Sequence, residues 1–373
     1  MTKRKIAVIG GGPAGFFAAI NAAESAQVDI YEKNVPLKTI LWTGNGRCNL
    51  SNNIADFKEL ASHYPRGEKF LYSIFSRFGV KETLEWFNSQ GLKTYVQKDN
   101  RIFPQTDQAA TVRNLLLKKA EEKNVKIIKS AVTEAPLNNY DAVIISTGGK
   151  NHELAKKLGH NITKLKPSLT SLNSNAQWIK GLAGVSVKNA RVQAFFKSKK
   201  VSDLTGDFVF THQGLSGPVI LDTSAYCAYL EPPFLLKVSF VSNFNSEELE
   251  TDKSISNILK PYIPKSLAVN LLAANNINPD KKCSSLTQKE KQVISKILLE
   301  TEIKITKPAK EGEIVTAGGV DLKEVDPRTM ESKLVKGVYF CGEVLDIDGL
   351  TGGFNLQMCW STGYLAGLNC YII

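Results

Sequence analysis

The sequence has few cysteines, and no two of them are closely spaced. The six cysteines are scattered over 373 residues, and none forms a C-x-x-C motif. We therefore expect no disulfide framework, and the pattern predicts a reducing, cytoplasmic location. The four histidines are isolated from one another, so no structural metal is expected either.

Long hydrophobic runs are also missing. The apolar stretches near both ends are interrupted by glycines, which argues against a membrane span or a membrane partner. No signal peptide is expected, because the basic start leads into a short run that ends at Gly10. With 43% hydrophobic and 22% charged residues, the chain has the composition of a soluble globular protein of two or three domains.

The net charge of +11 raises the possibility of a nucleic-acid partner. However, the lysines are spread along the chain, and no interleaving of aromatic and basic residues indicates a base-stacking surface. A basic surface also attracts an anionic cofactor or substrate. We therefore expect a small-molecule substrate rather than RNA or DNA, and the sequence leaves the oligomeric state open.

The most informative segment is KIAVIGGGPAG, residues 5–15. An apolar run ends at Gly10, and Gly10, Gly12 and Gly15 have the spacing G-x-G-x-x-G. A helix-like segment and a second apolar run ending at Glu32 follow, 22 residues after Gly10. This order is typical of a dinucleotide-binding unit, whose glycines allow a tight turn, approach of a diphosphate and close helix packing. An acid at position 32 favours FAD or NAD over NADP.

Two later segments fit the same site. The apolar run 142–145 leads into Thr147 and Gly148, and such a turn lies against the cofactor if its strand neighbours the first one. Near the C-terminus, a buried strand ends at Gly342, passes Glu343 and Asp346, and enters a helix after Gly353. Amide groups at that helix start can face an anion or a flavin carbonyl.

Between these segments the pattern of apolar and polar residues changes. From about residue 164 to 240, short β-like runs, including 219–222, alternate with polar turns, which predicts a small antiparallel barrel or sandwich. Residues 245–303 have helical spacing, as do residues 66–90 and 108–123.

The chain resembles a specific family, the NAD(P)/FAD-dependent oxidoreductases related to aminoacetone oxidase and to bile-acid 4,6-reductases. The resemblance covers nearly the whole chain. It is carried by the segments GGGPAG (10–15), TGNGRCN (43–49), FTHQGLSGP (210–218), VTAGGV (315–320), GEVLD (342–346) and GGFNLQ (352–357).

The resemblance implies an α/β fold with a Rossmann-like FAD domain built from both chain ends. A small β-barrel would be inserted into this domain, and a helical subdomain into the barrel. The expected divisions are 1–163 with 331–373 for the FAD domain, 164–243 with 304–330 for the barrel, and 244–303 for the helical subdomain. The cofactor-binding residues expected from the motifs and the resemblance are Gly10, Gly12, Pro13, Ala14, Gly15, Glu32, Lys33, Thr43, Gly44, Gly46, Arg47, Cys48, Thr147, Gly148, Gly342, Glu343, Asp346, Gly353, Asn355 and Leu356.

Several roles stay open at this point. Arg47 is a candidate for a phosphate contact or for tuning the flavin, while Cys48 is expected to be a packed residue rather than a redox thiol. His212 is the candidate proton donor or acceptor, with a hydrogen bond to its own turn as the alternative. Relatives carry a Gly/Ser-rich segment after the position of Gly149, and its apparent deletion here puts any nicotinamide or substrate contact at that point in doubt.

The predicted function is that of an FAD-dependent oxidoreductase. Hydride would pass between a nicotinamide donor or small organic substrate, the flavin, and an organic acceptor or O₂. With a single G-x-G-x-x-G motif, NAD(P)H would bind transiently over the flavin. Two alternatives remain: a flavoprotein that acts on or with RNA, and a non-catalytic FAD-binding redox sensor.

Overall fold

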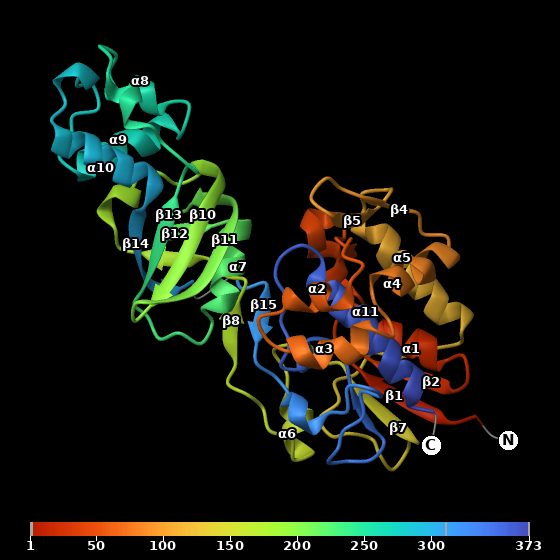
Figure 1. The fold of residues 1–373 in the computed structure, drawn as a ribbon. Helices are drawn as coiled ribbons and strands as arrows, with labels where there is room; N and C mark the ends of the chain where they lie inside the picture. Colours follow the sequence, from red (N-terminus) through yellow and green to blue (C-terminus); the bar gives the residue numbers. More distant parts are fainter. Residues whose placement is uncertain (1–2, 310–311, 372–373) are drawn as a thin grey trace. The chain divides into compact units, whose positions relative to one another are not determined.

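The computed structural model describes residues 3–309 and 312–371, which divide into two compact units. The first comprises residues 1–166 and 315–373, and the second residues 167–314. The first unit is therefore assembled from both ends of the chain (Figure 1). Within the described residues, no helix is long and apolar enough to span a membrane.

The first unit is built on a parallel five-stranded sheet. Its strand order is β16 (Val338–Phe340), β7 (Ala142–Ile145), β1 (Lys5–Ile9), β2 (Gln27–Tyr31) and β6 (Lys126–Ile128). Strand β1 pairs with β2 on one side and β7 on the other, and Ile9 lies opposite both Tyr31 and Ile145. The strands are apolar because helices cover both faces of such a sheet. The carboxyl ends of three strands thus meet beside Gly10.

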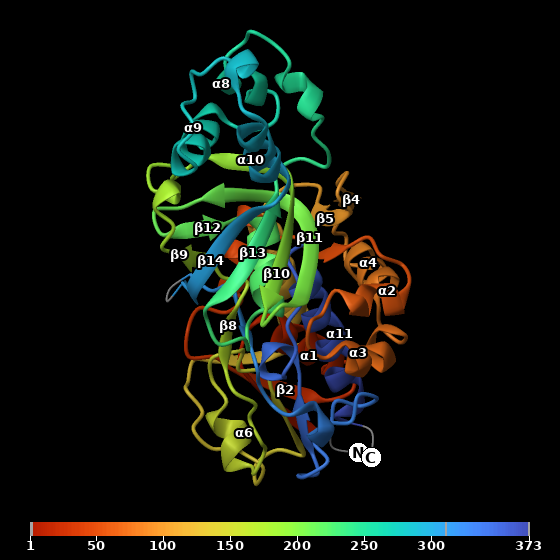
Figure 2. The same ribbon diagram turned by 60° about the vertical axis from the view of Figure 1, so that its left-hand side comes forward.

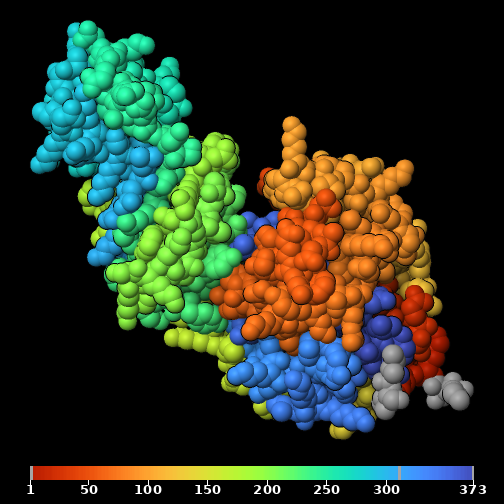
Figure 3. Space-filling view, in the orientation of Figure 1, coloured from red at the N-terminus to blue at the C-terminus, as the bar shows by residue number. Residues whose placement is uncertain are grey.

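The same unit contains four helices: α1 (Pro13–Ala22), α5 (Ala109–Glu122), α6 (Glu153–Lys157) and α11 (Phe354–Asn369). A smaller antiparallel sheet has the order β3 (Ser51–Asn52), β5 (Arg101–Pro104) and β4 (Thr94–Val96). The segment 66–90 forms two helices instead of one, because Gly79 begins a new helix and the Glu82 carboxylate accepts its N–H. Helices α2 (Phe57–Ser62), α3 (Glu68–Phe75) and α4 (Val80–Ser89) form much of the surface seen in Figure 3.

Helices α1 and α11 lie side by side and join the two chain ends (Figure 1). Their contact depends on glycine: a Cβ on Gly363 would lie 2.6 Å from the Ala14 carbonyl oxygen. A Cβ on Gly367 would lie 2.4 Å from the Ala18 carbonyl oxygen. Around this seam the ring of Phe17 packs 5.4 Å from that of Trp360.

A Gly367→Ala substitution is expected to push the two helices apart. Because the added methyl group meets backbone and cannot be accommodated by a side-chain rotation, we expect a loss of about 1–3 kcal/mol in the free energy of unfolding. Urea denaturation of the purified variant measures this loss. An unchanged denaturation midpoint would contradict the close helix contact.

The second unit is a closed barrel that carries helices at one end (Figures 1 and 2). Its strands follow the order β10 (Ser186–Phe196), β11 (Lys199–Phe210), β12 (Gly214–Ser216), β9 (Leu172–Ser174), β14 (Thr301–Pro308) and β13 (Phe234–Ser239). Helices α8 (Ile255–Leu259), α9 (Lys265–Ala274) and α10 (Gln288–Leu299) share one hydrophobic core with the barrel. The expected inserted barrel and helical segment are both present in the structure.

Two expectations need correction. Residues 219–222 are helical, within α7 (Pro218–Tyr226), because Gly217 with φ +97° and a proline at the first position begin a helix there. Residues 315–330 belong to the first unit and not to the barrel. Val320 forms backbone bridges to Ile162 and Leu345, which fix this segment, including β15 (Val315–Ala317), to the first unit. Strand β8 (Lys166–Ser168) lies where the chain leaves that unit.

Candidate cofactor site

The first glycine turn has one open position between two crowded ones. A Cβ on Gly10 would lie 2.3 Å from the Ser146 carbonyl oxygen, and one on Gly15 would lie 2.0 Å from the Gly10 carbonyl oxygen. Around the Cβ position of Gly12, by contrast, no described atom lies within 4 Å. The turn therefore leaves free space at Gly12, where a diphosphate would approach the backbone.

Helix α1 begins at this open position. Gly12 is its N-cap and Pro13 its first residue, and the described residues supply no side-chain cap and no acid in the first turn. The first intrahelical bond runs from Phe16 N to Gly12 O, so the amides of Ala14 and Gly15 lack a helical acceptor. This N-terminus is suited to an anionic group.

Glu32 is held at the end of β2, beside the glycine turn. Its carboxylate accepts the N–H of Gly11 at 2.7 Å and that of Asn34 at 2.6 Å. The side chain is thereby fixed on the side of the turn where the ribose-binding acid of a dinucleotide site is expected. Lys33, the next residue, is exposed.

The turn after β7 lies against Gly10 as expected. Ser146 donates through Oγ to the Gly10 carbonyl at 2.9 Å. The Thr147 hydroxyl donates to the Asn151 carbonyl at 2.5 Å, and Gly148 has a positive φ of +77°. The hydroxyl of Thr147 thus closes its own loop, while the backbone of this turn borders the candidate site.

The C-terminal motif also reaches the first glycine turn. A Cβ on Gly342, which has φ +75°, would lie 2.7 Å from the Cβ of Ala14. The Gly342 N–H donates to the Thr362 hydroxyl on α11 at 3.0 Å. Residues that are 328 positions apart in the sequence therefore form one site, which is what the motif analysis requires.

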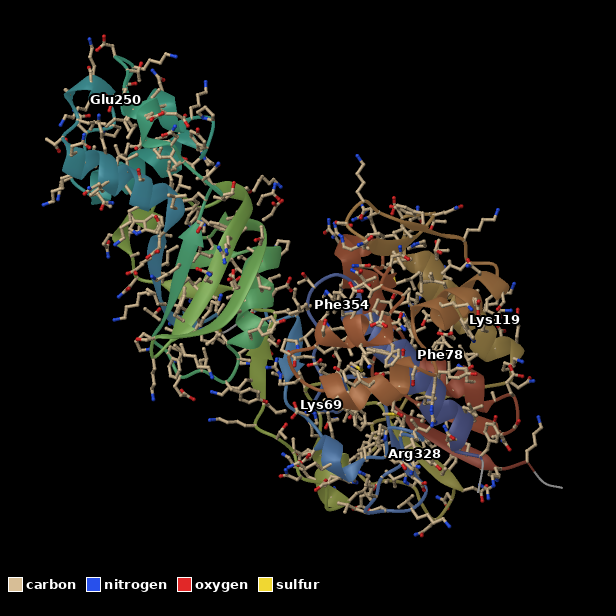
Figure 4. All side chains as sticks on the ribbon, in the orientation of Figure 1. Lys69, Phe78, Lys119, Glu250, Arg328 and Phe354 are labelled. Atoms are coloured by element: carbon tan, nitrogen blue, oxygen red, sulfur yellow. The ribbon has the colours of Figure 1, made fainter. Side chains whose placement is uncertain are left out.

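The start of α11 forms another border of the site. Gly353 is its N-cap, with φ +100°, and the described part of the chain offers no side-chain cap. The side chain of Asn355 is occupied: it accepts the Gly349 N–H and donates to the Gly349 carbonyl, both at 2.9 Å. Asn355 therefore fastens the preceding loop, and Phe354, labelled in Figure 4, stacks on His63 at 4.5 Å. The backbone of Leu356 lies in the same uncapped first turn.

The segment 43–49 combines strained backbone with packed side chains. Gly44, Gly46 and Cys48 have positive φ values of 57°, 80° and 61°. Cys48 is fully buried, and burial raises the pKa of its thiol to about 12, so the thiol stays protonated at neutral pH. The Thr43 hydroxyl donates to Ile40 O at 2.8 Å. These contacts support the packing role expected for Cys48.

The side chain of Arg47 packs against other residues of the protein. Its guanidinium lies 4.1 Å from the Phe103 ring centroid and 3.8 Å from the Asp107 carboxylate. The proposed phosphate or flavin contact of Arg47 stays a prediction.

His212 is exposed in the turn between β11 and β12, and its catalytic role also stays a prediction. Turnover of a His212→Ala variant that still binds FAD tests that role.

Two features of the site were not anticipated from the sequence. Asp348 is fully buried and forms a two-pronged ion pair with Arg66, which is 282 positions away. His152, which follows the turn after β7, is 3% exposed. Burial lowers the pKa of His152, which favours the neutral ring. Neither feature has a local sequence signal, because the partners are set by the tertiary fold.

Glu343 makes the site sensitive to pH. Burial raises the pKa of its carboxyl to about 7; the Asp348 carboxylate adds to the rise and the Lys150 ammonium opposes it. The folded chain thus keeps this proton above the ordinary value of 4.5, at which the unfolded chain loses it. The stability that this group contributes is present at low pH and falls as the pH rises from 4.5 through about 7.

We therefore expect Glu343→Gln to change the pH dependence of melting: between pH 5.5 and pH 8, the wild-type apoprotein should lose more stability, or gain less, than the variant. The size of the effect on unfolding is at most about 3 kcal/mol. Thermal melts across this pH range measure it. Glu121→Gln, on the exposed face of α5, is the control and should keep the wild-type slope. An equal slope in the Glu343→Gln variant would contradict the assignment.

Comparison with known proteins identifies the family of this chain. Residues 4–369 match the family model described as "HI0933-like protein Rossmann domain". The chain is 32% identical to a 3-dehydro-bile acid delta(4,6)-reductase of Clostridium scindens, covering 97% of this chain and 98% of the relative. It is 27% identical to a ribosomal RNA dihydrouridine synthase of Escherichia coli, covering 96% and 95%.

Among solved structures, a flavocytochrome c3 fumarate reductase in an open conformation is similar in fold. Its TM-score is 0.50 at 15% identity, over 99% of this chain and 78% of that one. The glycine cradle, the uncapped helix starts and the half-buried Glu32 carboxylate fit an FAD diphosphate and ribose. The chain belongs to the HI0933-like family and is an FAD-dependent oxidoreductase.

Proposed function

We propose that this enzyme is a reductase that hydrogenates a carbon–carbon double bond of a small organic substrate, with a nicotinamide as the transient hydride donor. The names of both relatives, a delta(4,6)-reductase and a dihydrouridine synthase, describe hydrogenation of such a bond. The observation that carries the proposal is the single cradle that Gly12, Ala14 and Gly342 form from the two chain ends. FAD, when bound there, supplies hydride transfer between donor and acceptor.

The protein's own residues supply binding and electrostatics. The amides at the start of α1, which lack a helical acceptor, would hold the diphosphate, and Glu32 would hold the ribose. Glu343 lies beside the Gly342–Ala14 contact, and its neutral form at pH below about 7 avoids repulsion of the diphosphate. Cys48 is protonated and buried, so we assign it no electron transfer.

The first experiment follows the visible spectrum of the purified protein under anaerobic conditions. NADH and NADPH are added separately, and we expect one of them to bleach the bands of oxidised flavin. A conjugated 3-oxo steroid is then added, and we expect faster recovery of the bands than with buffer alone. Bleaching without recovery in the presence of any acceptor would favour the sensor alternative instead.

A second candidate substrate is ribosomal RNA. It is favoured by the net charge of +11 and by the two dihydrouridine synthases, at 27% and 26% identity, among the relatives. The same reduced enzyme, mixed with an unmodified ribosomal RNA transcript, distinguishes the two. Flavin re-oxidation by RNA and a binding constant that falls steeply with salt would select RNA over the small molecule.

A further inference from the structure

Asn49, the last residue of the 43–49 motif, has a buried side-chain oxygen with no hydrogen-bond partner among the described residues. The residue is 7% exposed, and the oxygen in question is Oδ1. An unpaired buried acceptor costs a protein about 1–3 kcal/mol, so such groups are uncommon unless a ligand satisfies them.

The amide of Asn49 lies at the start of α11. A Cβ built on Gly353 would lie 2.8 Å from Asn49 Oδ1. The neighbouring backbone is fixed, since Trp360 Nε1 donates to the Leu50 carbonyl at 3.0 Å. Asn52 Nδ2 also donates to the Gly352 carbonyl at 3.2 Å. The segment that follows Asn49 is therefore fixed to Gly352 and to helix α11.

The helix start is the second, independent feature. Helix α11 has 16 residues, and its first internal bond runs from Gln357 N to Gly353 O at 3.0 Å. The amides of Asn355 and Leu356 thus have no helical acceptor, and they lie at the positive end of the helix. These donors favour a carbonyl oxygen or an anion, whereas Asn49 Oδ1 offers an acceptor.

A ligand that matches both features has a ring edge on which carbonyl and N–H groups alternate. We propose that Asn49 is a flavin-positioning residue: its Oδ1 accepts the N3–H of the isoalloxazine, while the α11 amides face the neighbouring C2 carbonyl. This inference rests on the proposed function, because it requires bound FAD. The same imide edge occurs in uracil, so the experiment must separate the two sources.

The test compares FAD with 3-methyl-FAD, in which a methyl group replaces the N3 hydrogen. Apoprotein is titrated with each cofactor, and binding is followed by the quenching of flavin fluorescence. We expect wild-type protein to bind 3-methyl-FAD at least about tenfold more weakly than FAD. We expect Asn49→Ala to bind FAD more weakly and to discriminate between the two cofactors by less than about twofold.

Two further variants serve as comparisons in this test. Asn52→Ala, which removes a neighbouring amide with a structural contact, should keep the wild-type discrimination. Asn49→Asp retains acceptor oxygens of the same size and should also keep the discrimination, with a lower flavin midpoint potential because of the added negative charge.

Asn49→Ala protein that still discriminates like wild type would overturn the inference. Equal binding of FAD and 3-methyl-FAD by wild-type protein would also overturn the inference. The case against it would be stronger if free uridine then bound wild type but not Asn49→Ala. If Asn49→Ala fails to fold, Asn49→Asp decides, since an unchanged potential would also overturn the inference. Wild-type protein that binds neither cofactor would instead refute the proposed function itself.

Discussion

A Gly12→Ser variant is expected to fold as well as the wild-type protein and yet to lose FAD. No described atom lies within 4 Å of the Cβ position at Gly12, so the fold accommodates the side chain. Serine is a favourable N-cap, and its hydroxyl would accept a hydrogen bond from an N–H group in the first turn of α1. Those same amides and that space are what a diphosphate requires.

The expected loss in FAD affinity is at least about 100-fold. One hydrogen bond to a charged group contributes about 1.5–3 kcal/mol, and the serine side chain also occupies the path of the diphosphate. Titration of the apoprotein measures affinity, and thermal melting without FAD measures stability. We expect the melting temperature of the apoprotein to stay the same or rise slightly.

Gly15→Ser is the matched control for this prediction. A Cβ at Gly15 would lie 2.0 Å from the Gly10 carbonyl oxygen and 2.5 Å from Ser146 Oγ. The same substitution there should destabilise the apoprotein itself, because backbone must move. If Gly12→Ser bound FAD normally, the diphosphate would have to lie elsewhere, and the candidate site would be wrong.

The sequence predicted those parts of the site whose signals are local. Gly10, Gly12 and Gly15 have a spacing that is typical of a tight turn before a helix, and Glu32 follows at the expected distance. The apolar runs gave the strands of the parallel sheet, since both of its faces are covered. The C-terminal motif predicted a segment that returns to the first glycine turn, and the family resemblance supplied the domain built from both chain ends, which the structure bears out.

Features set by long-range contacts were beyond the sequence. The β-branched residues at 219 and 220 indicated a strand, but the Gly217–Pro218 helix start outweighs that preference. The unpaired amide of Asn49 depends on how Gly353 packs against it. The Arg66–Asp348 pair joins two residues that are 282 positions apart, with no pattern to link them.

That ion pair carries the second large expected effect. Asp348 is fully buried, and the side chain of Arg66 is 15% exposed, with Nε and Nη2 each donating to one carboxylate oxygen. Removing one partner leaves a charge buried without its counter-charge, which costs about 3–5 kcal/mol. We therefore expect Asp348→Leu to lower the free energy of unfolding by this amount and to loosen the loop that Asn355 fastens to Gly349.

A double substitution distinguishes the charge from the packing. In Arg66→Met/Asp348→Leu both charges are absent, and hydrophobic residues of similar size often replace a buried pair with little loss. We expect the double variant to recover most of the stability that either single variant loses. Urea unfolding in a Trp178→Phe background measures this, because the remaining tryptophans, Trp42, Trp86 and Trp360, all belong to the first unit. Losses that simply add would show that the two side chains contribute independently, and that the pair does not join the chain ends energetically.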